Sequence, residues 1–290
     1  ISDFFTFEVP GASFMPSYRN RHWDGKIRLY NLSRRELYVG LLPYLLEFAK
    51  QLEYEVKLEM GEIGEEMSRD EVKEFASRLK LHSNWKPIQI RDYQEDAVFD
   101  AINGGRTLLL SPTASGKSLI IYNLARYHHA LGRKQLIVVP TTSLVEQMYG
   151  DFADYSTHNG FEVSKYCHRI YGGKEKTNNA DIVISTWQSI YKYPKKWFED
   201  FDVVYGDEAH LFKAKSLMTL MDKCTNARFR IGTTGTLDGT KTHRLVLEGV
   251  FGKVYKVTST KKLMDKKELA DLKIICMLIE YPDEERKLVS

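Results

Sequence analysis

The sequence predicts an α/β fold in which a small α+β region precedes a parallel β-sheet flanked by helices. From Ile88 onward, short β-rich runs alternate with helical stretches, which is the pattern of successive βαβ units. These runs are almost continuously apolar, as expected for parallel strands that are buried on both faces. The residues before Trp85 differ, because aromatic residues are frequent there and the apolar runs are short and alternating.

Five runs are the predicted strands of the sheet: RTLLL (106–110), QLIVVP (135–140), DIVIST (181–186), FDVVYGDE (201–208) and RFRIGTT (228–234). In the first region we predict one helix over 37–52, with Pro43 near its first turn or at a kink, and another over 68–81. Ser68 and Glu71 give the second helix a capping-box pattern. The stretch HSNWKP (82–87) is predicted to be a linker.

Length and composition narrow the class of protein. A chain of 290 residues is longer than one core usually holds, so two domains are expected. No apolar stretch is long enough to span a bilayer, and we therefore expect no membrane partner. The three cysteines are far apart and odd in number, which indicates a reducing, cytoplasmic setting without a zinc site. With a net charge of +3, any nucleic-acid contact must come from a local basic patch.

A phosphate-binding loop is indicated by SPTASGKS (111–118), which lies between a predicted strand and a predicted helix. Ser111 stands where the usual pattern has glycine, at the start of the loop, where other residues can also form the turn. Lys117 is expected to reach the β- and γ-phosphates of a nucleotide, and Ser118 to ligate Mg²⁺. The backbone N–H groups that would surround the phosphates belong to Thr113, Ala114, Ser115, Gly116, Lys117 and Ser118.

A second motif, VVYGDEAH (203–210), ends another predicted strand. Asp207 could hold Mg²⁺ through water, and Glu208 could orient and deprotonate the attacking water. Taken alone, the loop at 111–118 could equally be a polar strand-to-helix turn. Two independent motifs at the carboxyl ends of strands make a nucleotide site the better interpretation. His128 and His129 are expected to be ordinary surface residues of a helix.

Seven motifs in order now resemble those of the superfamily 2 helicases and translocases. Besides the two above they are RDYQ (91–94), VVPTTSLVEQ (138–147), YGG (171–173), ISTWQS (184–189) and GTTGT (232–236). The resemblance covers about 190 residues and implies a RecA-like lobe that binds ATP. It implies that Arg91 and Gln94 recognise adenine.

The same resemblance implies roles along a nucleic-acid track. The residues matching elements that hold a nucleic-acid backbone are Thr141, Thr142, Gly172, Gly173 and Thr186. Hydroxyls and glycine N–H groups can bond phosphates without reading bases, although threonines at strand ends also pack there for purely structural reasons. His210, Thr234 and Thr236 match the motifs that couple the hydrolytic site to this track. Here TGT replaces the more usual SAT, and the hydroxyls at both ends are kept.

A closer resemblance, to phage recombination and repair DNA helicases, rests on FMPSYRNRHWDGKIRLY (14–30), TTSLVEQM (141–148) and TGTLDG (234–239). It implies a motor that acts on branched DNA, namely forks, Holliday-type junctions and R-loops, in recombination, repair and replication. DNA, branched or duplex, is then the expected partner, together with an RNA–DNA hybrid.

The stretch PSYRNRHWDGKIRLYNLSRR (16–35) is basic and contains one acid, Asp24. We predict a hairpin with Asp24–Gly25 at its corner, on which basic side chains meet phosphates and aromatic rings stack on bases. The alternative is a solvated charged hairpin with its tryptophan packed beneath. The candidate DNA contacts are Arg19, Arg21, Trp23, Lys26 and Arg28.

The predicted organisation has three parts. Residues 1–85 form a DNA-binding domain, 86–260 the first RecA-like lobe, and 261–290 a connection toward a second lobe of the full-length chain. No motif of the second lobe follows Phe251, so the chain is expected to be an N-terminal fragment with weak or absent ATP hydrolysis. Two other functions stay open: an RNA helicase, and a nucleotide-gated nucleic-acid-binding module without turnover.

Overall fold

The computed structural model describes residues 1–59, 61, 63–172, 180–212, 214–237, 241–270, 275 and 277. The chain divides into two compact units, Ile1–Ser259 and Thr260–Ser290. The second unit contains helix α12 (Thr260–Asp265). The finer division that the sequence predicts at residue 85 stays a prediction.

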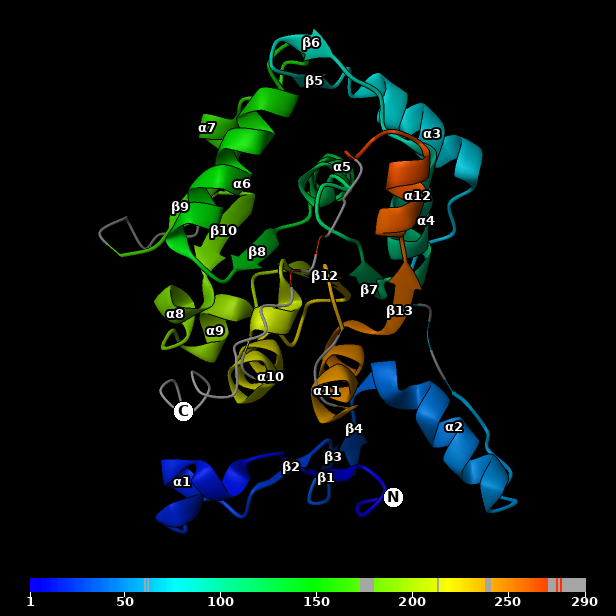
Figure 1. Cartoon of the computed structure of the whole chain (residues 1–290), viewed down its shortest axis with the longest axis vertical. Helices are drawn as coiled ribbons and strands as arrows, with labels where there is room; N and C mark the ends of the chain where they lie inside the picture. The colour runs from blue at the N-terminus through cyan, green and yellow to red at the C-terminus, as the bar shows by residue number, and fades with distance from the viewer. Residues whose placement is uncertain are drawn as a thin grey trace. The chain divides into compact units, whose positions relative to one another are not determined.

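The first unit is built on a seven-stranded parallel sheet, in agreement with the predicted fold class (Figure 1). The strands lie in the order β13-β7-β12-β11-β8-β10-β9. Their bounds are β7 Arg106–Leu110, β8 Gln135–Val139, β9 Cys167–Ile170, β10 Ile182–Thr186, β11 Val203–Gly206, β12 Phe229–Thr234 and β13 Lys253–Lys256. The five predicted strands are confirmed. Strands β9 and β13 were missed because, as the two edges of the sheet, they are half-polar and lack the continuous apolar pattern.

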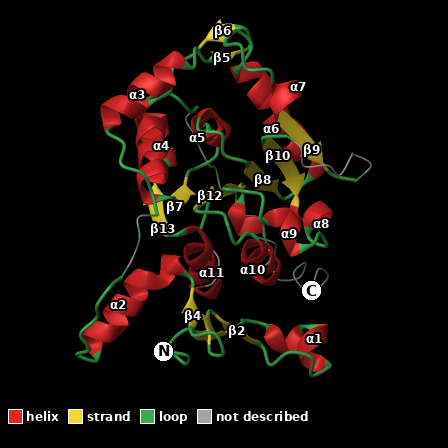
Figure 2. Ribbon diagram, turned by 180° about the vertical axis from the view of Figure 1, so that it is seen from behind, coloured by secondary structure: helices red, strands yellow, loops and turns green. Residues whose placement is uncertain are grey.

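Helices cover both faces of the sheet. One face carries α4 (Asp92–Gly104), α5 (Lys117–Ala130) and α6 (Thr142–Tyr155), and the other carries α10 (Ala214–Lys223) and α11 (Lys241–Phe251) (Figures 1 and 2). The short helices in between are α7 (Val163–Tyr166), α8 (Trp187–Ile190), α9 (Lys195–Phe198) and η3 (Ala209–Leu211). All strands of this seven-stranded sheet are parallel, so the loops that follow β7, β8, β10, β11 and β12 lie together at the carboxyl ends of the strands. Ligands bind at this edge in such sheets.

The first residues of the chain pack under α10 and α11. Phe5, Leu29 and Leu41 are buried in the same apolar cluster as Leu245 and Val246 of α11. The elements of this region are β1 Thr6–Glu8, η1 Ala12–Phe14, α1 Pro16–Arg19, β2 Lys26–Arg28, β3 Tyr30–Asn31, β4 Glu36–Leu37, η2 Val39–Leu41, α2 Leu42–Gln51 and α3 Arg69–Arg78. The capping box of α3 is present, and Pro43 lies in the first turn of α2, as predicted.

The predicted tight hairpin at Asp24–Gly25 is wrong. Strand β2 pairs antiparallel with β1, with Lys26 opposite Glu8, so residues 9–25 form the connection. The sequence-based prediction failed because it sought the partner strand next to the turn, where α1 lies instead. Ile27, Leu29 and Tyr30 all pack in or against the apolar core.

HSNWKP is a hairpin and not a linker. Strands β5 (His82–Ser83) and β6 (Lys86–Pro87) pair antiparallel, with Asn84 and Trp85 at positive φ of 51° and 64° in the turn. The backbone N–H of Asn84 donates to both carboxylate oxygens of Asp154 on α6, at 2.9 and 3.1 Å. This bond fixes the hairpin to the lobe.

His128 is fully buried, contrary to the expectation of a surface position. Helix α5 lies between α4 and α6 and against the sheet, so it is covered on nearly every side. The imidazole packs on Phe229 and its Nδ1 lies 2.9 Å from the Arg133 guanidinium. Burial, assisted by the nearby Arg133 charge, lowers the pKa of His128 to about 3.

No helix among the described residues is both long and apolar enough to cross a membrane.

Candidate nucleotide site and nucleic-acid surface

The phosphate-binding loop connects β7 to α5, as the motif requires. Gly116 caps α5 with φ 78°, and Ala114 has φ 64°. Ser111 is not among the residues with positive φ; its N–H donates to the carbonyl of Thr234 at 2.8 Å, and its hydroxyl lies 2.6 Å from that of Ser115. Ser111 therefore fits where glycine is usual, because the left-handed conformation falls at other positions of the loop.

Gln94 ties the loop to α4. Its Nε2 donates to the Ser115 carbonyl at 2.8 Å, and its Oε1 accepts from the Arg91 N–H at 2.9 Å. Gln94 is 2% exposed, and a Cβ placed on Gly116 would lie 2.3 Å from its Nε2. Arg91 donates from Nη1 to the Tyr93 hydroxyl at 2.7 Å. Gln94, one of the two residues predicted to recognise adenine, thus holds the loop in place.

A continuous run of polar contacts extends from the phosphate-binding loop to the end of β12. The Lys117 ammonium lies 2.8 Å from Glu208 Oε1, and Glu208 Oε2 lies 3.5 Å from His210 Nδ1. His210 Nδ1 is also 2.9 Å from the Thr234 hydroxyl, which donates to the Thr236 carbonyl at 2.8 Å. The structure therefore brings together residues from three motifs that are distant in the sequence.

Glu208 occupies a strained backbone conformation, with φ 49° and ψ 48° at the start of η3. A left-handed conformation at a residue other than glycine costs about 1–2 kcal/mol. Such strain persists where surrounding contacts hold it, and it directs this carboxylate at the loop.

Asp207 lies beside Glu208 and is 7% exposed. Burial raises its pKa, the Glu208 charge raises it further, and a hydrogen bond from the Thr233 hydroxyl, at 2.5 Å, opposes both. Two adjacent carboxylates with one ammonium leave negative charge facing the cavity, and oxygen donors suit Mg²⁺. The described residues hold no cluster of three or more His, Cys, Asp or Glu that could hold a metal ion by itself. The arrangement thus fits a cation held mainly by Ser118, Asp207 and a phosphate.

These groups line one cavity of about 260 Å³. Its walls come from the loop (Thr113, Ala114, Gly116, Lys117, Ser118), from α6 (Leu144, Gln147, Met148, Asp151) and from the β11 end (Asp207, Glu208). The contribution of α6 was missed by the sequence analysis. The Ser118 hydroxyl lies 2.9 Å from that of Tyr155. Burial raises the pKa of Asp151, and the nearby Ser118 hydroxyl lowers it.

Four of the five predicted backbone-contact residues lie at the same edge of the sheet but differ in exposure. Thr141 and Thr142 are exposed at the N-terminus of α6, where Thr141 Oγ1 accepts from the Leu144 N–H at 3.3 Å. Gly172 is exposed. Thr186 is 4% exposed, and its hydroxyl lies 2.8 Å from that of Ser189. Gly173 lies outside the described residues.

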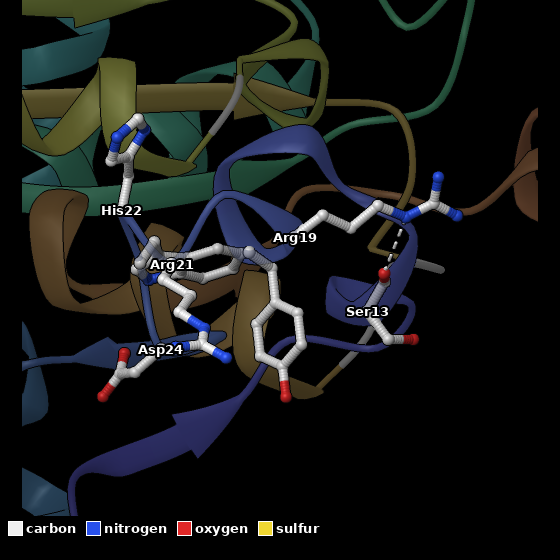
Figure 3. Close-up of a pocket in the computed structure, with 7 residues that line it drawn as sticks. Ser13, Arg19, Arg21, His22 and Asp24 are labelled. Carbon is white, nitrogen blue, oxygen red and sulfur yellow. Dashed lines mark hydrogen bonds between the residues drawn. The ribbon is translucent and has the colours of Figure 1, made fainter.

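The basic stretch forms a second cavity, of about 680 Å³, shown in Figure 3. Its lining is Ser13, Tyr18, Arg19, Arg21, His22, Trp23 and Asp24. Arg19 Nε donates to the Ser13 carbonyl at 3.3 Å, which leaves its terminal nitrogens available to an anion. In Figure 3 the side chain of His22 points away from those of Arg21 and Asp24. Arg21 has φ 58°.

The other candidate DNA contacts are Trp23, which lines this cavity, and Lys26 and Arg28, which do not, and all three are partly engaged. Arg28 donates to both Asp24 oxygens, and this pairing lowers the pKa of Asp24 to about 2. Trp23 Nε1 donates to the Lys26 carbonyl at 2.8 Å, and Lys26 Nζ lies 3.9 Å from Glu8. The indole is therefore fixed in orientation, while Arg28 and Lys26 each have an acidic neighbour.

The parallel sheet and its phosphate-binding loop define a RecA-like lobe of a superfamily 2 helicase. Residues 87–239 match the family model described as type III restriction enzyme, res subunit, and residues 1–59 match the model described as DNA helicase UvsW, N-terminal. Within that superfamily, the chain belongs to the UvsW helicase family.

Individual relatives agree with this assignment. The ATP-dependent DNA helicase UvsW of Enterobacteria phage T4 is 38% identical over 291 residues, 98% of this chain and 57% of the relative. A crystal structure of the UvsW helicase from bacteriophage T4 is 37% identical with a TM-score of 0.79, covering 88% of this chain and 91% of that one. A probable ATP-dependent helicase of Methanocaldococcus jannaschii is 34% identical over 119 residues, 38% of this chain and 14% of the relative. The chain thus spans little more than half of the first relative.

Proposed function

We propose that this chain carries the ATP-binding lobe and an accessory DNA-contacting region of an ATP-dependent DNA helicase that remodels branched DNA. The run of contacts from Lys117 through Glu208 and His210 to the end of β12 carries the proposal. The DNA helicases among its relatives support it. Forks, Holliday junctions and R-loops are the proposed substrates, in recombination, repair and replication in the cytoplasm of the host cell.

Each group at the cavity has a proposed task. ATP, bound with Mg²⁺, would supply a terminal phosphoryl group for transfer to water. Lys117 contacts the phosphate oxygens at the N-terminus of α5, whose dipole favours negative charge. Ser118 and Asp207 hold the metal ion. Glu208 orients the attacking water and accepts its proton.

The coupling step is assigned to the contacts beyond Glu208. His210 contacts both the Glu208 carboxylate and the Thr234 hydroxyl, so a change at the cavity alters the bonding at the end of β12. The His210 carbonyl lies 3.1 Å from His243 Nε2 on α11. A shift of His210 would therefore also reach the helix that packs on the first region of the chain.

DNA contact is proposed for both basic and hydroxyl-bearing residues. The hydroxyls of Thr141 and Thr142 suit phosphates, which carry no sequence information. Arg19, Arg21 and Arg28 suit the dense negative charge of a junction, and Trp23 suits an unpaired base. An R-loop, which contains an RNA–DNA hybrid, would offer the same phosphates and unpaired bases.

A second lobe of the same full-length chain is the proposed partner of this one. In helicases of this superfamily ATP lies between two lobes, and the second supplies arginines that stabilise the developing charge on the γ-phosphate. The length of the phage T4 relative leaves room for such a lobe. The chain by itself is therefore expected to bind ATP but to hydrolyse it weakly.

The test is binding of the chain to ATP and GTP with Mg²⁺, and then to forked DNA, plain duplex DNA and matched RNA. We expect saturable ATP binding that exceeds GTP binding, and forked DNA bound more tightly than duplex or RNA. Tighter binding of RNA than of matched DNA would favour an RNA helicase, because it would show a preference for the 2′-hydroxyl. Absence of nucleotide binding would contradict the proposal.

A further inference from the structure

The Ser118 hydroxyl is held by a helix that contributes to none of the nucleotide motifs. Ser118 is the second residue of α5, and its Oγ lies 2.9 Å from the hydroxyl of Tyr155, the last residue of α6. The Tyr155 ring packs edge-on against Tyr122, with ring centroids 5.4 Å apart. The phenol is therefore fixed beside Ser118 by packing within the core.

Asp151 lies one turn before Tyr155 on α6, so the two side chains share a face of the helix. Asp151 lines the same cavity as Ser118, Asp207 and Glu208. Burial raises the pKa of its carboxyl group, and the nearby Ser118 hydroxyl opposes this shift. The apolar packing of α6 is made by other residues, Val145, Met148 and Phe152, which are buried.

The hydrogen-bonding capacity of a serine hydroxyl shows what this arrangement does. A hydroxyl has one proton to donate and two lone pairs that accept. A serine hydroxyl that donates its proton to Asp151 and accepts from Tyr155 would have a single lone pair left for a ligand in the cavity. A carboxylate acceptor also makes the serine oxygen a stronger donor to a cation, as outer partners of metal ligands generally do.

We propose that Asp151 and Tyr155 are positioning residues for Ser118, which fix its hydroxyl so that one oxygen lone pair faces the metal ion of a bound Mg²⁺–nucleotide. The proposal rests on the proposed nucleotide-binding function of the cavity. It assigns to the C-terminal turns of α6 a part in metal affinity. Because the same helix begins at the exposed Thr141 and Thr142, it also connects the metal site to the candidate nucleic-acid contacts.

The experiment is a titration of the whole chain with a fluorescent ATP analogue, in Mg²⁺ and in EDTA. The ratio of the two affinities measures the gain from the metal. We expect Asp151→Ala and Tyr155→Phe to lower this ratio by about 10- to 100-fold, the usual effect of removing an outer partner of a metal ligand. Asp151→Asn should lie between wild type and Asp151→Ala, since its amide oxygen can still accept the serine proton. Binding in EDTA should stay within about twofold of wild type, because Lys117 and the loop are unchanged.

Asp154→Asn is the matched control, because Asp154 lies on the same helix but accepts from the Asn84 N–H. Its ratio should equal that of wild type. Equal reductions in affinity with and without Mg²⁺ would show a packing defect and overturn the proposal, and so would wild-type ratios in both Asp151→Ala and Tyr155→Phe. A wild-type chain that binds no nucleotide in either buffer would instead contradict the proposed function, and this inference with it.

Discussion

The nucleotide cavity and the basic surface around Arg19–Arg28 differ in how firmly their side chains are held. At the cavity, Gln94 and Asp207 are buried and hydrogen-bonded, and Lys117 is paired with Glu208. On the basic surface, Arg19 and Arg21 are exposed. A site for one small ligand gains from fixed geometry, whereas a surface for a long polyanion acts through charge and tolerates mobile side chains. A single substitution should therefore change nucleotide affinity strongly at the cavity, whereas each substitution on the basic surface should change DNA affinity by a smaller amount.

Lys117→Ala should give the largest effect. Removing a charged donor to phosphate costs about 1.5–3 kcal/mol, so ATP affinity should fall by about 10- to 100-fold. Calorimetric titration with ATP and Mg²⁺ measures this, with Lys196→Ala as the control, since Lys196 is exposed and outside the cavity lining. Binding to forked DNA should change by less than about twofold, because sites without shared partners behave nearly additively. An equal fall in DNA affinity would contradict the claim that the cavity and the basic surface bind their ligands independently.

Gly116→Ala and Gly132→Ala form a matched pair that tests the fixed geometry of the loop. Both glycines have positive φ, 78° and 70°, but a Cβ at Gly116 would meet Gln94 Nε2 at 2.3 Å, whereas at Gly132 nothing lies within 4 Å. Both variants should lose about 1 kcal/mol of stability from the backbone conformation. Only Gly116→Ala should also weaken ATP binding, by several-fold. Thermal unfolding and ATP titration decide this; equal ATP affinities in the pair would mean that the loop adapts freely.

His128 predicts a pH dependence of stability. Its pKa in the folded chain is about 3, below the ordinary value of 6.5, so the unfolded chain binds more protons between these values. Stability should therefore fall as the pH falls below 6.5, by on the order of 2 kcal/mol at pH 5. His128→Asn should show a smaller fall between pH 7 and pH 5, measured by urea unfolding. Identical slopes in the two proteins would contradict a neutral buried imidazole.

Asp24→Asn should have the smallest effect, and it should raise an affinity, that for DNA, where the substitutions at the nucleotide site lower one. Asp24 is paired with Arg28, and removing its charge frees that guanidinium for phosphate. Forked-DNA affinity should rise a few-fold, and its dependence on salt should steepen by up to about one unit. Asp70→Asn, an equal charge change at α3, serves as the control. A lower affinity in Asp24→Asn would indicate that the pair shapes the surface for binding.

The sequence predicted the parts of the molecule that depend on local backbone patterns. SPTASGKS and VVYGDEAH lie at strand ends as expected, because a loop between a buried strand and a helix is specified by adjacent residues. The position of β2 could not be predicted, since it pairs with β1 across residues 9–25. The burial of His128 and the approach of Asp151 to Ser118 depend on helix packing, which no motif encodes.

The central claim is that the basic surface, separately from the nucleotide cavity, directs this chain to DNA. Its most direct test is forked-DNA binding across a salt series, for wild type, for Lys117→Ala, and for the combined Arg19→Ala, Arg21→Ala, Trp23→Ala and Arg28→Ala variant. Each arginine that no longer neutralises a phosphate should reduce the slope of log K against log salt by about 0.9 on duplex DNA. Because Arg28 is paired with Asp24 in the wild type, the slope of the combined variant should be smaller by up to about 1.8. Lys117→Ala should keep the wild-type slope. A combined variant that binds like wild type, or a Lys117→Ala slope that falls equally, would contradict the claim.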